Sequence, residues 1–173
     1  MLPIVLDPKN VKMAVIGQGP AMARRLSQLQ GGGAENVVLI DMAVDEAPTA
    51  DDLKGVGVVF IAGLDATIAA QMAAIAKSAG ALVNAEDMTD KCDFHMPAVV
   101  RRGDLLLTAS TGGNSPGLAR GLRVSLESQF GEEWAQIVDD VAEARRGWLA
   151  EGANMKTVAE RTEQLINKNG WLA

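Results

Sequence analysis

The feature that most constrains this sequence is a glycine turn near its start, flanked by two short apolar runs. The first run, residues 12–16 (KMAVI), ends at Gly17, and the second run occupies residues 36–41 (NVVLID). Between them, residues 18–30 carry apolar side chains about one helical turn apart, and the glycines at 31–33 end the segment. Strand, glycine turn, helix and buried strand form a βαβ unit, whose crossover is almost always right-handed. The chain is therefore expected to build an α/β fold on a parallel sheet.

The alternation of strands and helices continues through the first half of the chain. Residues 56–63 (VGVVFIAG) form a third apolar run, and residues 66–80 form an alanine-rich helix that ends at a glycine. A fourth predicted strand, residues 81–85, leads into a polar loop. Open parallel sheets bind ligands beyond the carboxyl ends of their strands, so this loop lies where chemistry is expected.

After Pro97 the pattern changes to a hairpin and then to helices. A turn at residues 102–104 joins two runs, and Ser115 is a plausible cap for a helix that has Pro116 at its first position. From Gly131 the chain reads as helical, with Asn154 capping a last helix that stops at Gly170. We expect a Rossmann-like domain at 1–96, an α+β dimerisation unit at 97–130 and a helical tail at 131–173.

The predicted dimerisation unit has an apolar stripe that it cannot bury alone. Leu118, Leu122 and Leu126 recur at a spacing of four residues, which places them on one face of the predicted helix. Pairing with a second copy would cover this face, and twofold dimers are the commonest arrangement. We therefore expect a homodimer.

Composition and charge exclude several classes of function. A formal net charge of −6 and a sequence pI near 4.8 argue against nucleic-acid binding, which needs a basic surface. The single cysteine indicates a reducing compartment, and no signal peptide or apolar run of membrane-spanning length is evident. We expect a cytoplasmic protein with no nucleic-acid or membrane partner.

The glycine turn resembles part of a dinucleotide fingerprint. Gly17 permits a tight turn, and Gly19 lets the backbone approach a pyrophosphate at the helix start. Met22 stands where the fingerprint has a third small residue, so we expect looser packing or an outward shift of the helix. Asp41 ends the second strand, where a carboxylate accepts bonds from ribose hydroxyls and repels the 2′-phosphate of NADP. NAD is therefore the favoured cofactor, against the alternative that the turn serves packing only.

The loop NAEDMTDKCDFHMPA, residues 84–98, concentrates titratable side chains. Asp87, just past the fourth strand, is the preferred general base. If the strand continues, Glu86 points the opposite way, and it is expected to be solvated. Asp90 and Asp93 have ordinary loop roles in the simpler interpretation. Cys92 and His95 supply only two zinc ligands, too few for a structural site, so Cys92 is expected to be a small buried residue. No resident metal is predicted.

Three segments together resemble the precorrin-2 dehydrogenase/sirohydrochlorin ferrochelatase family, which includes the N-terminal module of bifunctional siroheme synthases. They are LPIVLD, VIGQGPAMARR and LVNAEDMTDKCDFHMPAVVRRGDLLLTASTGGNSPGLARGLR, and the resemblance covers about residues 1–130. It implies a homodimer whose NAD-binding Rossmann domain, residues 1–96, uses NAD⁺ to oxidise precorrin-2 to sirohydrochlorin. Some members also insert Fe²⁺, and Asp87 with His95 would then contact that ion transiently. The resemblance also implies that Asp87 is catalytic and that Thr111 matches a position that is phosphorylated in some relatives.

The resemblance and the residues together define a candidate site. The candidate cofactor-binding residues are Gly17, Gly19, Pro20, Ala21, Asp41, Met42 and Asp65. Cationic and polar groups for the carboxylates of a tetrapyrrole substrate are Arg101, Arg102, Asn114, Ser115 and Arg120. The arginines could instead be surface residues or form dimer salt bridges. Met22, and Leu64 where the family usually has threonine, support the rival interpretation of a non-catalytic dimer that senses NAD or a tetrapyrrole.

Overall fold

The computed structural model describes residues 2–172, and the chain divides into two compact units, Met1–Met96 and Pro97–Ala173. The elements of the first unit are β1 (Met13–Gly17), α1 (Gly19–Gly31), β2 (Val37–Asp41), β3 (Val58–Ala62), α2 (Ala66–Ser78), β4 (Leu82–Ala85) and the 3-10 turn η1 (Thr89–Lys91). The elements of the second are β5 (Ala98–Arg102), β6 (Leu105–Ala109), α3 (Pro116–Gln129), α4 (Trp134–Ala150) and α5 (Met155–Asn169). The predicted α/β class with a parallel sheet is confirmed.

The first unit is a four-stranded parallel sheet in the order β2-β1-β3-β4. The chain moves outward from β1 to β2 on one side and then to β3 and β4 on the other. This reversal is the switch point at which open α/β sheets leave a crevice beyond the carboxyl ends of the strands. Gly17, the last residue of β1, lies opposite both Asp41 and Ala62, so the three strand ends meet at one edge.

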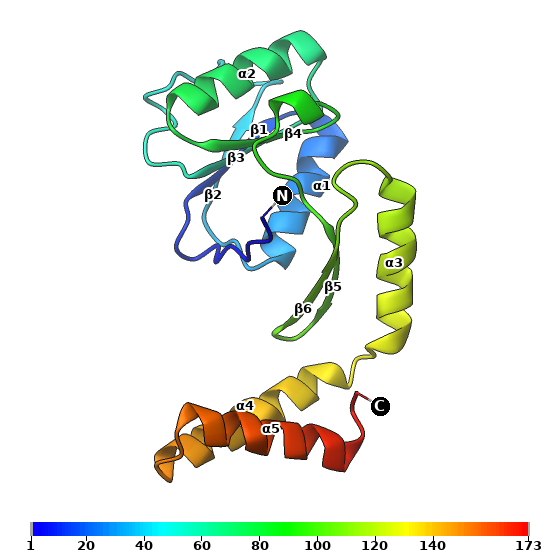
Figure 1. Cartoon of the computed structure of the whole chain (residues 1–173). Coiled ribbons are helices and arrows are strands. Elements are labelled where there is room, and N and C mark those ends of the chain that lie inside the picture. Colours follow the sequence, from blue (N-terminus) through cyan, green and yellow to red (C-terminus); the bar gives the residue numbers. More distant parts are fainter. Residues whose placement is uncertain (1, 173) are drawn as a thin grey trace. The chain divides into compact units, whose positions relative to one another are not determined.

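The two faces of the sheet are covered by different helices, as Figure 1 shows. Side chains alternate along each strand, so Ala14 and Ile16 join α2 in one buried cluster, while Met13 and Val15 join α1 in the other. Strands buried on both faces read as continuous apolar runs, which is why the sequence pattern identified them.

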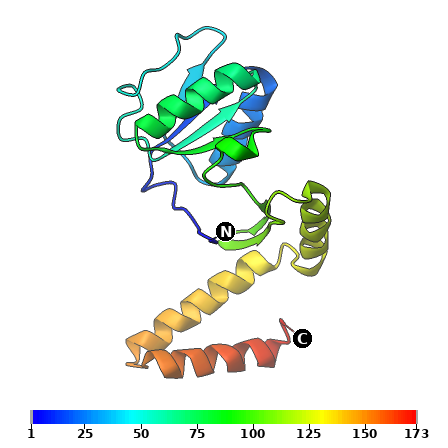
Figure 2. The ribbon, with the colours of Figure 1, turned by 45° about the horizontal axis from the view of Figure 1, so that its top comes forward.

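The second unit joins the antiparallel β5–β6 hairpin and α3 to a helical hairpin made of α4 and α5 (Figure 2). The predicted caps are confirmed, because Ser115 accepts from Leu118 N and Asn154 accepts from Thr157 N. The last helix ends at Gly170, which has a left-handed φ of 64°. Among residues 2–172, no helix combines the length and the apolar character needed to cross a bilayer.

Candidate active site

The turn between β1 and α1 is pressed against the end of β3. A Cβ on Gly17 would lie 2.1 Å from the carbonyl oxygen of Ala62, closer than any side chain tolerates. Gln18 N donates to the same carbonyl at 3.2 Å, which clamps the turn onto the neighbouring strand. Gly17 is therefore required by the packing of the backbone itself.

At two further glycines, Gly63 and Gly19, no side chain covers the backbone around this turn. Gly63, directly after β3, has a φ of +72°, and a Cβ there would lie 2.3 Å from the carbonyl oxygen of Gln18. Gly19 has a φ of +62°, and nothing lies within 4 Å of where its Cβ would stand. The space above Gly19 is open, so a ligand can approach its backbone closely. This is the cradle that a dinucleotide fingerprint requires.

The start of α1 leaves its backbone N–H groups available to an anion. Its N-cap residue, Gln18, makes no side-chain capping bond, whereas Asp65 caps α2 by accepting from the backbone of Thr67 and Ile68. Uncapped N–H groups and the helix dipole favour negative charge at such a terminus. The predicted pyrophosphate position thus has suitable donors, while one oxygen of Asp65 is committed to capping α2.

Met22 corrects an expectation from the sequence. Its side chain is buried in the cluster between α1 and the sheet, beside Met13 and Val15. Its Cβ lies 3.3 Å from the position that a Gly17 Cβ would occupy, so helix and strand remain close. The expectation of looser packing is wrong, because the flexible thioether adapts to the core and the missing side chain of Gly17 provides room. An outward shift of α1 stays a prediction.

Asp41 and Met42 shape the far side of the glycine turn. Met42 N donates to Gly17 O at 2.8 Å, which extends the pairing of β1 with β2 by one residue. Oδ1 of Asp41 accepts from Ala43 N at 3.0 Å, and Oδ2 of Asp45 accepts from Asp41 N at 2.7 Å. The end of β2 therefore presents two neighbouring carboxylates, which disfavour a phosphate group at this position.

A pocket of about 310 Å³ opens at the carboxyl ends of β3 and β4. It is lined by Ile61, Ala62, Gly63, Leu64, Ala66, Ala69, Glu86, Asp87 and Met88. Asp87 is exposed and has a φ of +58°, the one left-handed non-glycine conformation among residues 2–172. Such backbone conformations cost energy and cluster at active sites.

The structure corrects the position expected for the Glu86 side chain. It is half-buried, and its Oε2 accepts from Gly63 N at 3.2 Å, so it turns back toward the end of β3. Its Oε1 lies 3.8 Å from Nη2 of Arg24 on α1. The strand ends at Ala85, so the alternation of strand side chains no longer applied to Glu86. Glu86, Gly63 and Arg24 are candidate site residues that the sequence did not indicate, although Gly63 ends the third apolar run.

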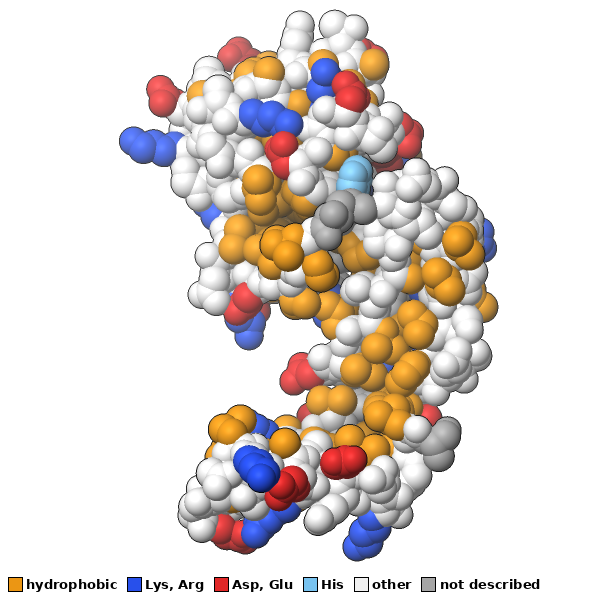
Figure 3. Space-filling view, viewed as in Figure 1, with side chains coloured by type: hydrophobic (Ala, Val, Ile, Leu, Met, Phe, Trp, Pro, Cys, Tyr) orange, Lys and Arg blue, Asp and Glu red, His pale blue; other side chains and the backbone are white. Residues whose placement is uncertain are grey.

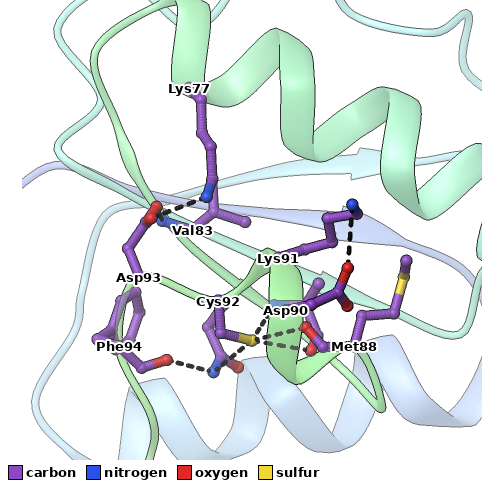
Figure 4. A network of polar contacts seen from close by, with 10 residues as sticks. Lys77, Val83, Met88, Asp90, Lys91, Cys92, Asp93 and Phe94 are labelled. Carbon is purple, nitrogen blue, oxygen red and sulfur yellow. Dashed lines mark hydrogen bonds and ion pairs between the residues drawn. The ribbon is translucent and has the colours of Figure 1, made fainter.

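The loop after β4 is closed on itself by buried polar contacts, shown in Figure 4. Asn84, which is 7% exposed, donates from Nδ2 to the carbonyl oxygen of Phe94 at 2.9 Å. The half-buried thiol of Cys92 lies within hydrogen-bonding distance of the backbone of Ala85 and Met88. Cys92 thus has a structural role that holds the loop around Asp87 in place.

Asp93 fastens the end of this loop to the edge of the sheet. Its carboxylate accepts from Val83 N at 2.9 Å and from Lys77 Nζ at 2.8 Å. The hydrogen bond from Lys77, together with that from Val83, lowers the pKa of the Asp93 carboxyl despite some desolvation. The expected loop role of Asp93 is confirmed, and Asp90 similarly pairs with Lys91 at 3.0 Å.

Asp93→Asn is expected to lower the free energy of unfolding at pH 7 by about 1 kcal/mol, since it loses the charge-assisted bond. Because the folded pKa of Asp93 is depressed, its stabilisation is present above the pKa of the unfolded chain and is lost as pH falls through the folded pKa. Urea titrations of both proteins should therefore differ at pH 7 and converge in acid. A difference that persists at pH 2 would contradict this assignment.

The described residues contain no preformed cluster of metal-ligating side chains. Among residues 2–172, no group of three or more His, Cys, Asp and Glu side chains could hold a metal ion. His95 is half-buried, and Cys92 is engaged with the backbone. Contact of Fe²⁺ with Asp87 and His95 stays a prediction.

The candidate substrate residues lie in the second unit, and some of them are already bound to other groups of that unit. Arg102 donates from Nε to Phe130 O at 3.0 Å and pairs with Glu132 at 3.4 Å, so it secures the end of α3 to the hairpin. Asn114 donates to Thr111 O, and Ser115 caps α3. Arg101 and Arg120 are exposed, and neither has an acidic partner within residues 2–172. These two guanidinium groups are the ones available to an anionic ligand.

Sheet topology, glycine turn and strand-end carboxylates together define an α/β protein with a dinucleotide-binding crevice. A family profile described as "Putative NAD(P)-binding" matches residues 4–98, more than half of the chain. The chain belongs to this family.

Curated relatives carry the name siroheme synthase. That of Methylococcus capsulatus is 32% identical over 93% of this chain and 38% of the relative, and siroheme synthase 1 of Pectobacterium atrosepticum is 34% identical over 73% of this chain and 30% of the relative. The chain thus spans about a third of the length of these relatives. A solved structure described as SirC, precorrin-2 dehydrogenase, matches 100% of this chain and 93% of its own, with a TM-score of 0.74 and 23% identity, which supports the same fold.

Proposed function

We propose that the chain is an NAD-dependent precorrin-2 dehydrogenase, which oxidises precorrin-2 to sirohydrochlorin in the synthesis of siroheme. The observation that carries this proposal is Asp87, a carboxylate held at a left-handed φ of 58° in the pocket at the end of β4. The names of the curated relatives and of the solved structure point to the same reaction. The motifs from Val83 to Arg123 support it from the sequence.

The proposed cofactor is NAD, and the chain offers suitable groups for it. Gly17 and Gly19 leave the turn open for a pyrophosphate, and the N–H groups at the start of α1 would bind it. The free oxygen of Asp41 would accept a ribose hydroxyl, and Asp45 adds a second negative charge against the 2′-phosphate of NADP. Pro20 and Ala21 in the first turn of α1, Met42 directly after β2 and Asp65 at the cap of α2 are proposed to complete the site.

Asp87 is proposed to be the general base. The oxidation converts precorrin-2 and NAD⁺ into sirohydrochlorin, NADH and a proton, and the bound nicotinamide supplies the hydride acceptor. The carboxylate of Asp87 takes the proton, a task for which an exposed acid at the mouth of a pocket is suited. Arg101 and Arg120 are proposed to bind substrate carboxylates, while Arg102 positions the hairpin.

The direct test is anaerobic incubation of the purified protein with NAD⁺ and precorrin-2. Growth of the NADH absorbance at 340 nm in proportion to sirohydrochlorin is expected. Binding of NAD⁺ and sirohydrochlorin in a calorimeter without any turnover would instead favour the sensor alternative. Adding Co²⁺ or Fe²⁺ to purified sirohydrochlorin then tests the chelatase step that the resemblance implies.

We further propose that the protein is a homodimer joined through its second unit. Within residues 97–172, the buried apolar side chains are those of Val100, Ala109 and Val158, too few for a stable core. Leu118 and Leu122 of α3 are 57% and 44% exposed, and Figure 3 shows hydrophobic side chains at the surface of this unit. A second copy would cover this stripe with the same stripe of its own.

Replacing both Leu118 and Leu122 with serine is expected to shift the protein from dimer to monomer in sedimentation, because the apolar contact is removed. Val44→Ser is the matched control, since Val44 is 82% exposed and belongs to the first unit rather than to the proposed contact helix. A wild-type protein that sediments as a single 18.2 kDa chain would contradict the proposed dimer.

A further inference from the structure

Glu86 occupies a prominent position in the crevice but has no role in the proposed reaction. Its Oε2 accepts from Gly63 N at 3.2 Å, and a Cβ on Gly63 would meet the carbonyl oxygen of Gln18 in the glycine turn. The carboxylate of Glu86 is therefore held at the point where the ends of β3 and β4 meet the turn. It also lines the pocket that contains Asp87.

The positive charges near Glu86 come from two arginines of α1. Arg24 lies 3.8 Å away, with a side chain that is 67% exposed, while the side chain of Glu86 is 34% exposed. Arg25 lies over the ring of Phe60 at 5.3 Å; burial lowers its pKa, and the charge of Glu86 opposes that shift. Glu86 is thus held by a backbone N–H but is only partly neutralised, because its arginine partner is largely exposed to solvent.

The opposite end of the crevice is marked by Asp41, which ends β2 beyond the glycine turn. A dinucleotide whose adenosine ribose binds Asp41 must extend across the turn toward β3 and β4. Its diphosphate belongs at the uncapped start of α1, between these two ends. Glu86 is held at the β3 and β4 side of the turn, where the nicotinamide end of such a dinucleotide would be placed.

We propose that Glu86 is a specificity residue that makes the site prefer the oxidised cofactor. This inference rests on the proposed function. The nicotinamide ring is cationic in NAD⁺ and uncharged in NADH, so a nearby carboxylate attracts only the oxidised form. Selective binding of NAD⁺ and faster release of NADH would follow, which suits an enzyme that consumes NAD⁺.

The proposal is tested by measuring the dissociation constants of NAD⁺, NADH and ADP-ribose by calorimetry. Glu86→Gln keeps an oxygen that accepts from Gly63 N but removes the charge. It should weaken NAD⁺ binding about fivefold, equivalent to about 1 kcal/mol, and leave NADH and ADP-ribose within about twofold. Glu163→Gln, an exposed change on α5 that removes the same net charge, should leave all three unchanged.

A second variant, Arg24→Met, is expected to change the preference for NAD⁺ over NADH in the opposite direction. Removing this cation should strengthen the preference for NAD⁺ over NADH, because the charge of Glu86 is then less neutralised. If Glu86→Gln changes NAD⁺, NADH and ADP-ribose by equal factors, Glu86 acts on the common part of the ligand and the proposal is overturned. If wild-type protein binds none of the three, the proposed function fails instead.

Discussion

Replacing Asp87 with asparagine is expected to lower the rate of NADH formation from precorrin-2 by about 100-fold or more, since a positioned general base contributes roughly 10²–10⁴-fold. Asparagine is among the residues that best tolerate a left-handed φ, so the backbone at +58° should be retained. The variant should therefore fold and still bind NAD⁺. Single-turnover absorbance at 340 nm would measure the rate, with binding checked separately.

The matched control for this prediction is Asp90→Asn in the same loop. Asp90 is exposed, and its carboxylate pairs with Lys91 at 3.0 Å, so its loss should change the rate by no more than about twofold. Wild-type turnover in Asp87→Asn would show that another group takes the proton. Equal losses in both variants would point to a disturbed loop rather than to a base.

The architecture of the crevice was predictable because it depends on local patterns and one topological rule. Continuous apolar runs identify buried parallel strands, and the carboxyl ends of such strands meet at one edge. The observed pairing of Gly17 with Asp41 and Ala62 follows directly from this rule. The helix caps at Ser115 and Asn154 were likewise readable, because a cap is a contact between near neighbours in the sequence.

The parts that the sequence missed depend on contacts between distant backbone atoms. Glu86 turns toward Gly63 N because β4 ends at Ala85, and no periodicity indicates where a strand stops. Arg102 reads as an available cation, yet its guanidinium group is bound to Phe130 O, 28 residues later. Side-chain charge is visible in a sequence, whereas the backbone carbonyl that binds it is not.

Gly17→Ala and Gly19→Ala are expected to separate the folding role of the glycine turn from its binding role. The Cβ of the first would lie 2.1 Å from Ala62 O, so strand and turn must move apart, at a cost of about 3 kcal/mol or more. The Cβ of the second meets nothing within 4 Å, so its cost is limited to about 1–2 kcal/mol for a left-handed alanine.

Binding should show the reverse contrast, and urea unfolding with NAD⁺ calorimetry measures both. Gly19→Ala should remain folded yet lose at least about tenfold in NAD⁺ affinity, because its new methyl group fills the space through which a pyrophosphate approaches the backbone. Gly31→Ala, at the far end of the same helix and also without neighbours within 4 Å, controls for the substitution. A Gly19→Ala protein with unchanged NAD⁺ affinity would mean that no ligand approaches this turn, and Gly17 would then serve packing alone.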